Sequence, residues 1–448
     1  MKIKKKILTK AMVVASLAVM TAMPTVFAKT VNLDLNQVVE MALRNDPSIK
    51  ISEATVEQYK EAKTAAKAAQ LLTISATSVA QRSGYTDSTH YSSSLADGSK
   101  YIQNGFSNTV TASIPIYSGG KIDGNIEVAN QELKAYQHDL QATLQSTKLT
   151  ATSDYYNVLE AKNNVEVLKE SVARLQEHLK NTKTQYDVGV VAKTDVLRSE
   201  VELADAQQSL ISAENTYAVA VSTLNNLIGL DLNTELNLMG ELKYSKDNRT
   251  LEESLEYALK NHPSIHEVEA GVKAAKAAIK TKNAAYMPQV TASFSDNWTK
   301  DEWPADEDEN WTAKVTATWN IFDSGITAAG IRKARAAQLE AIHTLKQTKD
   351  SVAIAVKTAY LNIRSAERRI PTTKIALEQA KEDYRIAQVS YNAGVATNTD
   401  VMDAQVSLTS ANTNYIAALY DYNVALASLD SAMGLSVEKP GIEVKVNK

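Results

Sequence analysis

Two short segments that carry acidic residues are near copies of each other. YDVGVVAKTDVLR covers residues 186–198 and YNAGVATNTDVMD covers residues 391–403, so the two tyrosines lie 205 positions apart. Over the first twelve positions six residues are identical, and these include the tyrosine, the glycine and the Thr-Asp-Val triplet. The glycine is a residue at which a helix can break, and an acid shortly afterwards suits the positive end of a returning helix. The pattern therefore predicts two helical turns, each followed by a carboxylate.

Little else in the chain points to catalysis or to a bound cofactor. There are no cysteines, which excludes disulfides, thiolate metal sites, thiol nucleophiles and a lipidated N-terminal Cys. The net charge of −4 argues against nucleic-acid binding, and no GxxxxGK[ST] nucleotide motif is present. His262 and His266 stand four apart and could bind a metal, but a solvated helix face explains them better. We expect no enzyme activity, no cofactor and no metal site.

The N-terminus has the pattern of a secretory signal peptide. MKIKKKILTK carries five lysines, an uncharged apolar run follows, and VFA ends at Ala28. The apolar run is shorter than the ~20 residues of a spanning helix, which makes a membrane anchor the weaker alternative. Residues 1–28 are therefore predicted to be removed on export.

The remaining chain reads as one unit written twice. NDPSI at 45–49 returns as NHPSI at 261–265, and PIYSGG at 115–120 returns as NIFDSG at 320–325. LNNLIGL at 224–230 returns as LDSAMGL at 429–435. We predict repeat 1 at 29–232, repeat 2 at 233–435 and a tail at 436–448.

Each repeat is predicted to contain a long antiparallel helical hairpin. The stretches 125–188 and 331–393 lack glycine, and about 65 helical residues span about 100 Å. Apolar residues recur three and four apart, as expected of a coiled coil; in repeat 1 they are Val165, Leu168, Val172, Leu175 and Leu179, continued by Thr182 and Tyr186. The hairpin tips fall at 186–195 and 391–400. Pro371 is expected to kink its helix or to unwind it locally.

Before each hairpin the hydrophobic period changes to two. Four strands are predicted, at 71–82, 106–117, 288–298 and 311–321, and alternation over about 10 residues is typical of membrane β-strands. All four tryptophans, Trp298, Trp303, Trp311 and Trp319, lie in one strand pair, as in an aromatic girdle at a membrane interface. A half-buried hairpin of a soluble domain is the alternative. Four strands cannot close a barrel, so membrane strands imply an oligomer; two chains would give a filled barrel, and three would give twelve strands with room for a passage.

This ordered set of motifs resembles the TolC-type outer-membrane efflux proteins over essentially the whole mature chain. The resemblance implies a mainly α fold with a β-barrel: three subunits share a 12-stranded barrel in the outer membrane of a diderm bacterium. Their coiled-coil hairpins continue it as an α-barrel tunnel through the periplasm. It also implies an exit duct of a tripartite efflux pump or type I secretion system. The partners would be a periplasmic adaptor and, indirectly, an inner-membrane transporter.

The family's functional residues map onto the two tips. By resemblance, Tyr391 from repeat 2 and the Thr194–Asp195 pair from repeat 1 hold the entrance shut, while Asp400 and Asp403 line its narrowest point.

The adaptor would contact the turns, which are Val188, Gly189 and Val190 in repeat 1 and Ala393, Gly394 and Val395 in repeat 2. Where relatives carry a gating arginine this chain has Ala396, so the ion-pair part of the latch is missing. The alternative function is a periplasm-spanning coiled coil that spaces envelope layers without conducting, which explains the helices but not the alternating strands or the acids at the tip.

Overall fold

The computed structural model describes residues 31–85, 101–301 and 308–438; the expected signal peptide, Trp303 and the end of the tail lie outside these residues. The first half contains β1 (Val31–Leu33), α1 (Leu35–Asn45), α2 (Pro47–Ala68), β2 (Thr73–Tyr85), β3 (Tyr101–Tyr117), α3 (Lys121–Asp187) and α4 (Lys193–Ile228). The second half contains β4 (Leu236–Leu238), α5 (Leu251–Asn261), α6 (Pro263–Asn283), a short 3-10 turn (Ala284–Tyr286), β5 (Gln289–Lys300), β6 (Asp308–Thr318), α7 (Ile326–Asn392) and α8 (Asn398–Ala432). The order of helices and strands in the first half thus recurs in the second.

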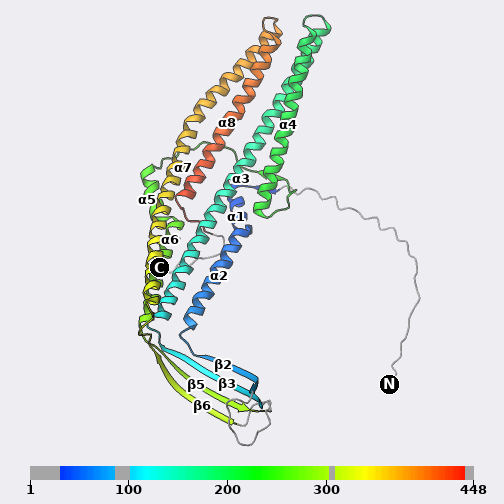
Figure 1. The fold of residues 1–448 in the computed structure, drawn as a ribbon. Coiled ribbons are helices and arrows are strands. Elements are labelled where there is room, and N and C mark those ends of the chain that lie inside the picture. Colours follow the sequence, from blue (N-terminus) through cyan, green and yellow to red (C-terminus); the bar gives the residue numbers. More distant parts are fainter. Residues whose placement is uncertain (1–30, 86–100, 302–307, 439–448) are drawn as a thin grey trace, which may run out of the picture.

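Four long helices form an elongated layer. α3 and α7 have 67 residues each, which corresponds to about 100 Å. The helices of each hairpin pack on each other, and the two hairpins meet through α3 and α8, so the order is α7, α8, α3, α4. Both hairpin tips lie at one end of the molecule and the strands lie at the other (Figure 1). No helix of the described residues is long and apolar enough to cross a membrane.

The strands form one antiparallel sheet in the order β2, β3, β5, β6. Residues paired across neighbouring strands lie on the same face of a sheet. One such row is apolar and consists of Ile74, Ala112, Phe294 and Ala313. The adjacent row is polar and consists of Thr73, Ser113, Ser293 and Lys314. The sheet therefore has a polar face and a face, called apolar below, that is apolar nearer the helices and also carries Asp296 and Glu309 farther out.

The tryptophans that the structure describes lie on or beside the apolar face. Trp311 pairs with Asp296 and its ring lies 6.3 Å from Phe294, while Trp298 pairs with Glu309 on the same face. Trp319 follows β6, and its indole N–H donates to the carbonyl of Tyr286 at 3.0 Å. β6 begins and ends three residues earlier than its expected bounds, because its register with β5 pairs Asp308 with Thr299.

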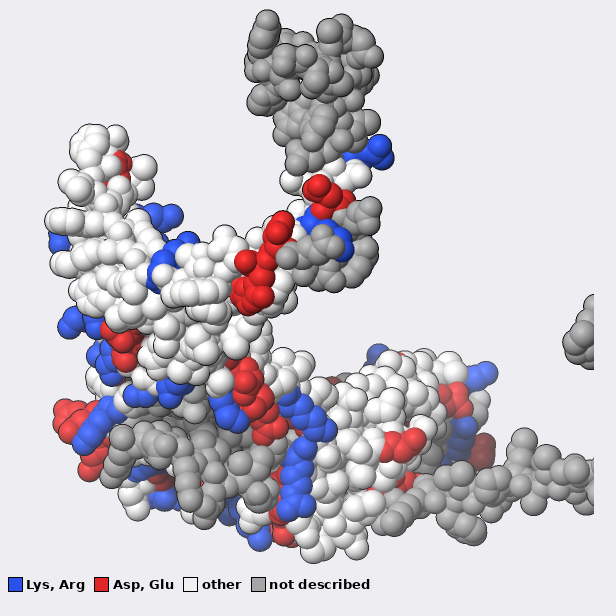
Figure 2. All heavy atoms as spheres, turned by 90° about the horizontal axis from the view of Figure 1, so that it is seen from below, with Lys and Arg blue, Asp and Glu red and all other residues white. Residues whose placement is uncertain are grey.

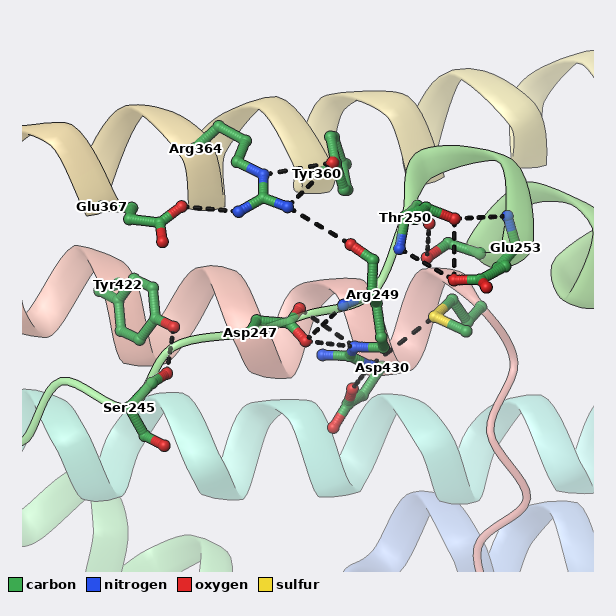
Figure 3. A network of polar contacts seen from close by, with 12 residues as sticks. Ser245, Asp247, Arg249, Thr250, Glu253, Tyr360, Arg364, Glu367, Tyr422 and Asp430 are labelled. Carbon is green, nitrogen blue, oxygen red and sulfur yellow. Dashed lines mark hydrogen bonds and ion pairs between the residues drawn. The ribbon is translucent and has the colours of Figure 1, made fainter.

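An extended segment, residues 239–250, binds the helices in the middle of the molecule; we call it the strap. It follows the parallel pair β1–β4 and lies along α7 and α8, as Figure 3 shows for part of it. Arg249 pairs with Asp247 at 3.0 Å and with Asp430 of α8 at 2.5 Å. Arg364 of α7 donates to the carbonyl of Arg249 at 3.4 Å. The strap therefore ties the middle of α7 to the part of α8 that lies farther from the tip.

Two further features concern the helices and the surface. α7 runs through Pro371 without the local unwinding that was one expected outcome. Its neighbours Thr372 and Thr373 donate their hydroxyls to main-chain carbonyls one turn back, at 3.2 and 3.0 Å.

Viewed from the sheet end, basic and acidic side chains are interspersed over the part of the surface that the structure describes (Figure 2).

Candidate functional site

The two hairpin tips are built by the same backbone device. Gly189 and Gly394 adopt φ values of +78° and +77°, a left-handed conformation that glycine adopts without strain. The next residue then closes the helix end: Val190 N–H donates to the Gln185 carbonyl at 2.8 Å, and Val395 N–H to the Ser390 carbonyl at 3.0 Å. This is the Schellman arrangement, and it explains why the glycine is needed in both copies.

The turns expose apolar side chains. Val188 and Val190 are each 71% exposed, and Val395 is 81% exposed. Ala393 and both glycines of the turns are exposed as well. Each expected adaptor-contact residue thus lies on the outer surface of a tip.

Asp400 is part of a helix cap. Thr397 is the N-cap of α8; its N–H and hydroxyl both donate to the Asp400 carboxylate at 2.7 Å, and its hydroxyl accepts from the Asp400 N–H at 3.3 Å. These hydrogen bonds, the backbone bond first, hold the pKa of Asp400 below its ordinary value. The carboxylate therefore stays ionised at neutral pH and is turned towards its own helix end.

Asp403 belongs to a group of acids that two helices contribute. It is exposed on α8, one turn beyond Asp400. Burial raises the pKa of Glu202 on α4, and the charges of Asp205 and Asp403 raise it further. The structure thus brings acids of α4 and α8 to the same region below the tips.

Tyr391 contacts residues that the sequence did not single out. It is buried, its hydroxyl lies 3.3 Å from the hydroxyl of Thr182, and its ring centroid lies 5.0 Å from that of His178. His178 Nε2 in turn lies 2.6 Å from Oδ1 of Asn398. We call the buried residues His178, Thr182, Ser199, Tyr391 and Asn398 the polar layer.

Asp195 joins this layer through its main chain. Its carbonyl accepts from Nδ2 of Asn398 at 3.2 Å and from the hydroxyl of Ser199 at 2.9 Å. Thr194 is exposed. The hydroxyl of Tyr391 therefore contacts Thr182 on α3 and not the Thr194–Asp195 pair.

One signal in the sequence could have indicated the polar layer. Thr182 is a polar residue in the apolar stripe of α3, and His178 precedes it by one helical turn. A buried polar group requires hydrogen-bond partners. The identity of the partners depends on the pairing of α3 with α8, which the sequence pattern alone does not specify.

Ala396 packs in an apolar environment. It contacts the cluster that α7 and α8 form below their turn, which includes Leu377, Tyr384 and Val401. An alanine here contributes apolar contact and no charge. In the described parts of the chain, no group of three His, Asp or Glu side chains is arranged to hold a metal ion.

Comparisons with known proteins agree on one family. The model of the family described as outer membrane efflux protein matches residues 38–230 and 255–435. The outer membrane protein TolC of Vibrio cholerae is 24% identical over 330 residues, which are 71% of this chain and 75% of that protein. The pyoverdine export outer membrane protein OpmQ of Pseudomonas aeruginosa is 24% identical over 408 residues, 90% of this chain and 84% of OpmQ.

The fold matches solved structures as well. The CmeC outer membrane channel of Campylobacter jejuni superimposes with a TM-score of 0.79 at 17% identity, covering 91% of this chain and 86% of CmeC. The resemblance inferred from the sequence motifs is thereby confirmed. The chain belongs to the outer membrane efflux protein family and is an outer-membrane protein of the TolC type.

Proposed function

We propose that this protein is the outer-membrane exit duct of a tripartite efflux pump or type I secretion system. It conducts substrates passively, as a homotrimer, and performs no catalysis. The observation that carries the proposal is the union in one chain of a two-faced sheet with helices of about 100 Å at its end. Such a chain can open a passage through a membrane and extend it across the space behind the membrane.

The sheet supports a barrel made by three chains. Its outer strands β2 and β6 have free edges within one chain, and free edges are not tolerated in lipid. Joining β2 of one protomer to β6 of the next closes twelve strands, with the apolar face towards lipid and the polar face towards water. Trp298, Trp311 and Trp319 then serve as interface aromatics.

The helical layer supports the same symmetry. α7 exposes apolar residues at one heptad position, namely Ile354, Leu361, Ile375 and Val389, with the exposed Arg368 and Glu382 between them. α4, at the opposite edge of the layer, exposes Leu197 and Ile211, fourteen residues apart. Two unlike edges that match head to tail generate a closed ring when the rotation between neighbours closes. In three copies the ring is the periplasmic tunnel.

The mouth of the tunnel lies at the hairpin tips. Thr194, Asp195, Tyr391, Asp400 and Asp403 surround it, and the acids of three protomers concentrate negative charge there. Exposed Val188, Val190 and Val395 offer the apolar contact that a periplasmic adaptor protein would cover. An inner-membrane transporter acts through that adaptor.

The decisive experiment records single channels in a planar bilayer. Wild type is expected to show cation-selective openings. Asp403→Asn is expected to lower the permeability ratio for cations about fivefold, because a carboxylate about 4 Å from a cation contributes about 1 kcal/mol in water. Asp383→Asn, an exposed acid on α7, serves as the matched control and should leave selectivity unchanged.

The competing function is a structural spacer that does not conduct. A folded trimer that forms no channel under any condition would favour that function. Channels in which Asp403→Asn equals wild type would support the duct and reject the acid ring.

A further inference from the structure

The seams between the four long helices differ in chemistry near the tips. The α7–α8 seam is apolar and contains Leu377, Tyr384, Val401, Ala404 and Leu408. The α3–α8 seam, which joins the two hairpins, contains polar side chains instead. Its buried members include His178 and Ser171 on α3 and Asn398 and Gln405 on α8. Apolar seams resist water, whereas a polar seam can exchange its hydrogen bonds for water.

The polar layer joins all four long helices. Asn398 Oδ1 lies 2.6 Å from His178 Nε2 and 3.3 Å from Ser199 Oγ, while its Nδ2 donates to the Asp195 carbonyl at 3.2 Å. That carbonyl can only accept, which fixes the amide orientation of Asn398. His178 Nε2 must then carry a hydrogen and donate. Neutral His178 is therefore the Nε2–H tautomer.

Thr182 and Tyr391 complete the polar layer. The Thr182 hydroxyl donates to the His178 carbonyl at 3.0 Å, so it accepts from the Tyr391 hydroxyl at 3.3 Å. Tyr391 on α7 is thereby linked to α3. Each of the four helices thus supplies at least one partner.

A second polar row lies farther from the tips, with Ser171 seven residues before His178 on α3 and Gln405 seven residues after Asn398 on α8. Gln405 Nε2 donates to the hydroxyl of Ser171 at 3.1 Å and to that of Thr409 at 3.0 Å. The buried Oε1 of Gln405 has no partner among the described residues. An unpaired buried acceptor gains a hydrogen bond when water enters. The second row therefore favours hydration of the α3–α8 seam once the hydrogen bonds of the polar layer have opened.

We propose that His178 and Asn398 form the latch of the closed mouth and that protonation of His178 releases it. This inference rests on the proposed duct, because it concerns the opening of the mouth. His178 and Asn398 are positioning residues that hold the hairpins together through the α3–α8 seam.

The surroundings of His178 determine the sign of the pH effect. Tyr391 faces it from α7 and Asn398 from α8, while Ser199 and the Asp195 carbonyl of α4 contact Asn398. Among nearby charged residues, Glu177 on α3, Arg198 on α4 and Asp400 on α8 are exposed, and the Asp195 side chain is half-buried. Burial lowers the pKa of His178, and the hydrogen bond to Asn398 opposes this only in part.

Proton uptake is consequently linked to opening. In the closed state His178 resists protonation, and in a hydrated seam its pKa returns towards the ordinary histidine value of about 6.5. A group with a lowered pKa in one state binds protons better in the other, so acid favours the open state.

The test measures the distance between the tips without relying on conduction. The chain has no cysteine, so nitroxide labels at Asp187→Cys and Asn392→Cys, both exposed positions at the ends of α3 and α7, are specific. Double electron–electron resonance is recorded on the full protein in lipid nanodiscs at about pH 7.5 and about pH 5.5, a range in which histidine titrates. We expect the share of long distances to rise about threefold or more on acidification.

Two variants locate the effect. His178→Gln keeps a donor for Asn398 and cannot take up a proton, so its distances should not respond to pH. His343→Gln, at an exposed position on α7, should respond as wild type does. If His178→Gln does not fold, Asn398→Ser carries the test, since it should show long distances already at neutral pH.

Each remaining outcome has one meaning. A wild type that does not respond to acid, or a His178→Gln protein that still responds, overturns the latch. Distances that respond as expected in a protein that never conducts would reject the duct and leave the latch standing. A protein that conducts, but in which the distances between the tips do not respond to pH, would support the duct and reject the latch.

Discussion

The first helical turn of α8 shows how one side chain distinguishes two otherwise matching tips. Thr397 caps α8 through Asp400. The corresponding residue of α4 is Ala192, which has no side-chain cap bond, although Asp195 stands at the third helical position as Asp400 does. The two positions are 205 apart, as the two motifs are. The chain therefore contains its own control for the contribution of the cap.

Substitutions at these two positions should have opposite effects on the stability of the helix that follows each. Thr397→Ala is expected to destabilise the start of α8 by about 1 kcal/mol, the usual contribution of an N-cap. Ala192→Thr should protect the start of α4, because a threonine there can complete a capping box with Asp195. Amide hydrogen exchange at residues 398–401 and 193–196 measures both. Equal exchange rates in all three proteins would show that the caps do not control fraying of the tips.

At the level of helices and strands, local chemistry predicts more than tertiary pairing does. Gly189 and Gly394 predicted the helical turns at the tips, because a left-handed residue is a local requirement. The alternation of apolar and polar residues predicted the four strands. The strand ends could not be predicted, since the pairing of Asp308 with Thr299 determines where β6 begins. The partners of His178 were out of reach for the same reason: Asn398 lies 220 residues away in sequence.

The strap provides a test of the connection between helices. Arg249→Met removes the hydrogen bonds to Asp247 and Asp430 while keeping most of the side-chain volume. Because hydrogen bonds to charged groups contribute about 1.5–3 kcal/mol and Asp247 is largely buried, we expect about 2 kcal/mol of destabilisation in denaturant unfolding. Lys243→Met removes an ion pair in which both side chains are exposed, and it should change stability by well under about 1 kcal/mol. Equal effects of the two variants would contradict a clamping role for Arg249.

For the whole molecule, the arrangement of charged and apolar surface separates three tasks. The sheet end has an apolar face that suits lipid, the middle is bound by the strap, and the tips combine acids with exposed valines. Near the tips the two hairpins meet through polar side chains and α7 and α8 share an apolar cluster, whereas farther from the tips one apolar core joins all four long helices. A tip can therefore separate from its neighbour while the hairpins remain intact, which is what a gated duct requires and a static spacer does not.

In the proposed trimer, assembly depends on the two outer helix edges of each chain. Ile375 is 64% exposed in the single chain and belongs to the heptad edge of α7, so burial against α4 of a neighbour would remove most of its apolar surface from water. Burial of an isoleucine side chain contributes about 1.5–3 kcal/mol, and in the proposed trimer Ile375→Glu would replace that gain with a buried charge at each of three interfaces. We expect native mass spectrometry to show loss of most of the trimer at micromolar concentration. Lys374→Glu introduces the same residue at the adjacent exposed position and should leave the trimer intact; a trimer that survives Ile375→Glu would place the subunit interface elsewhere.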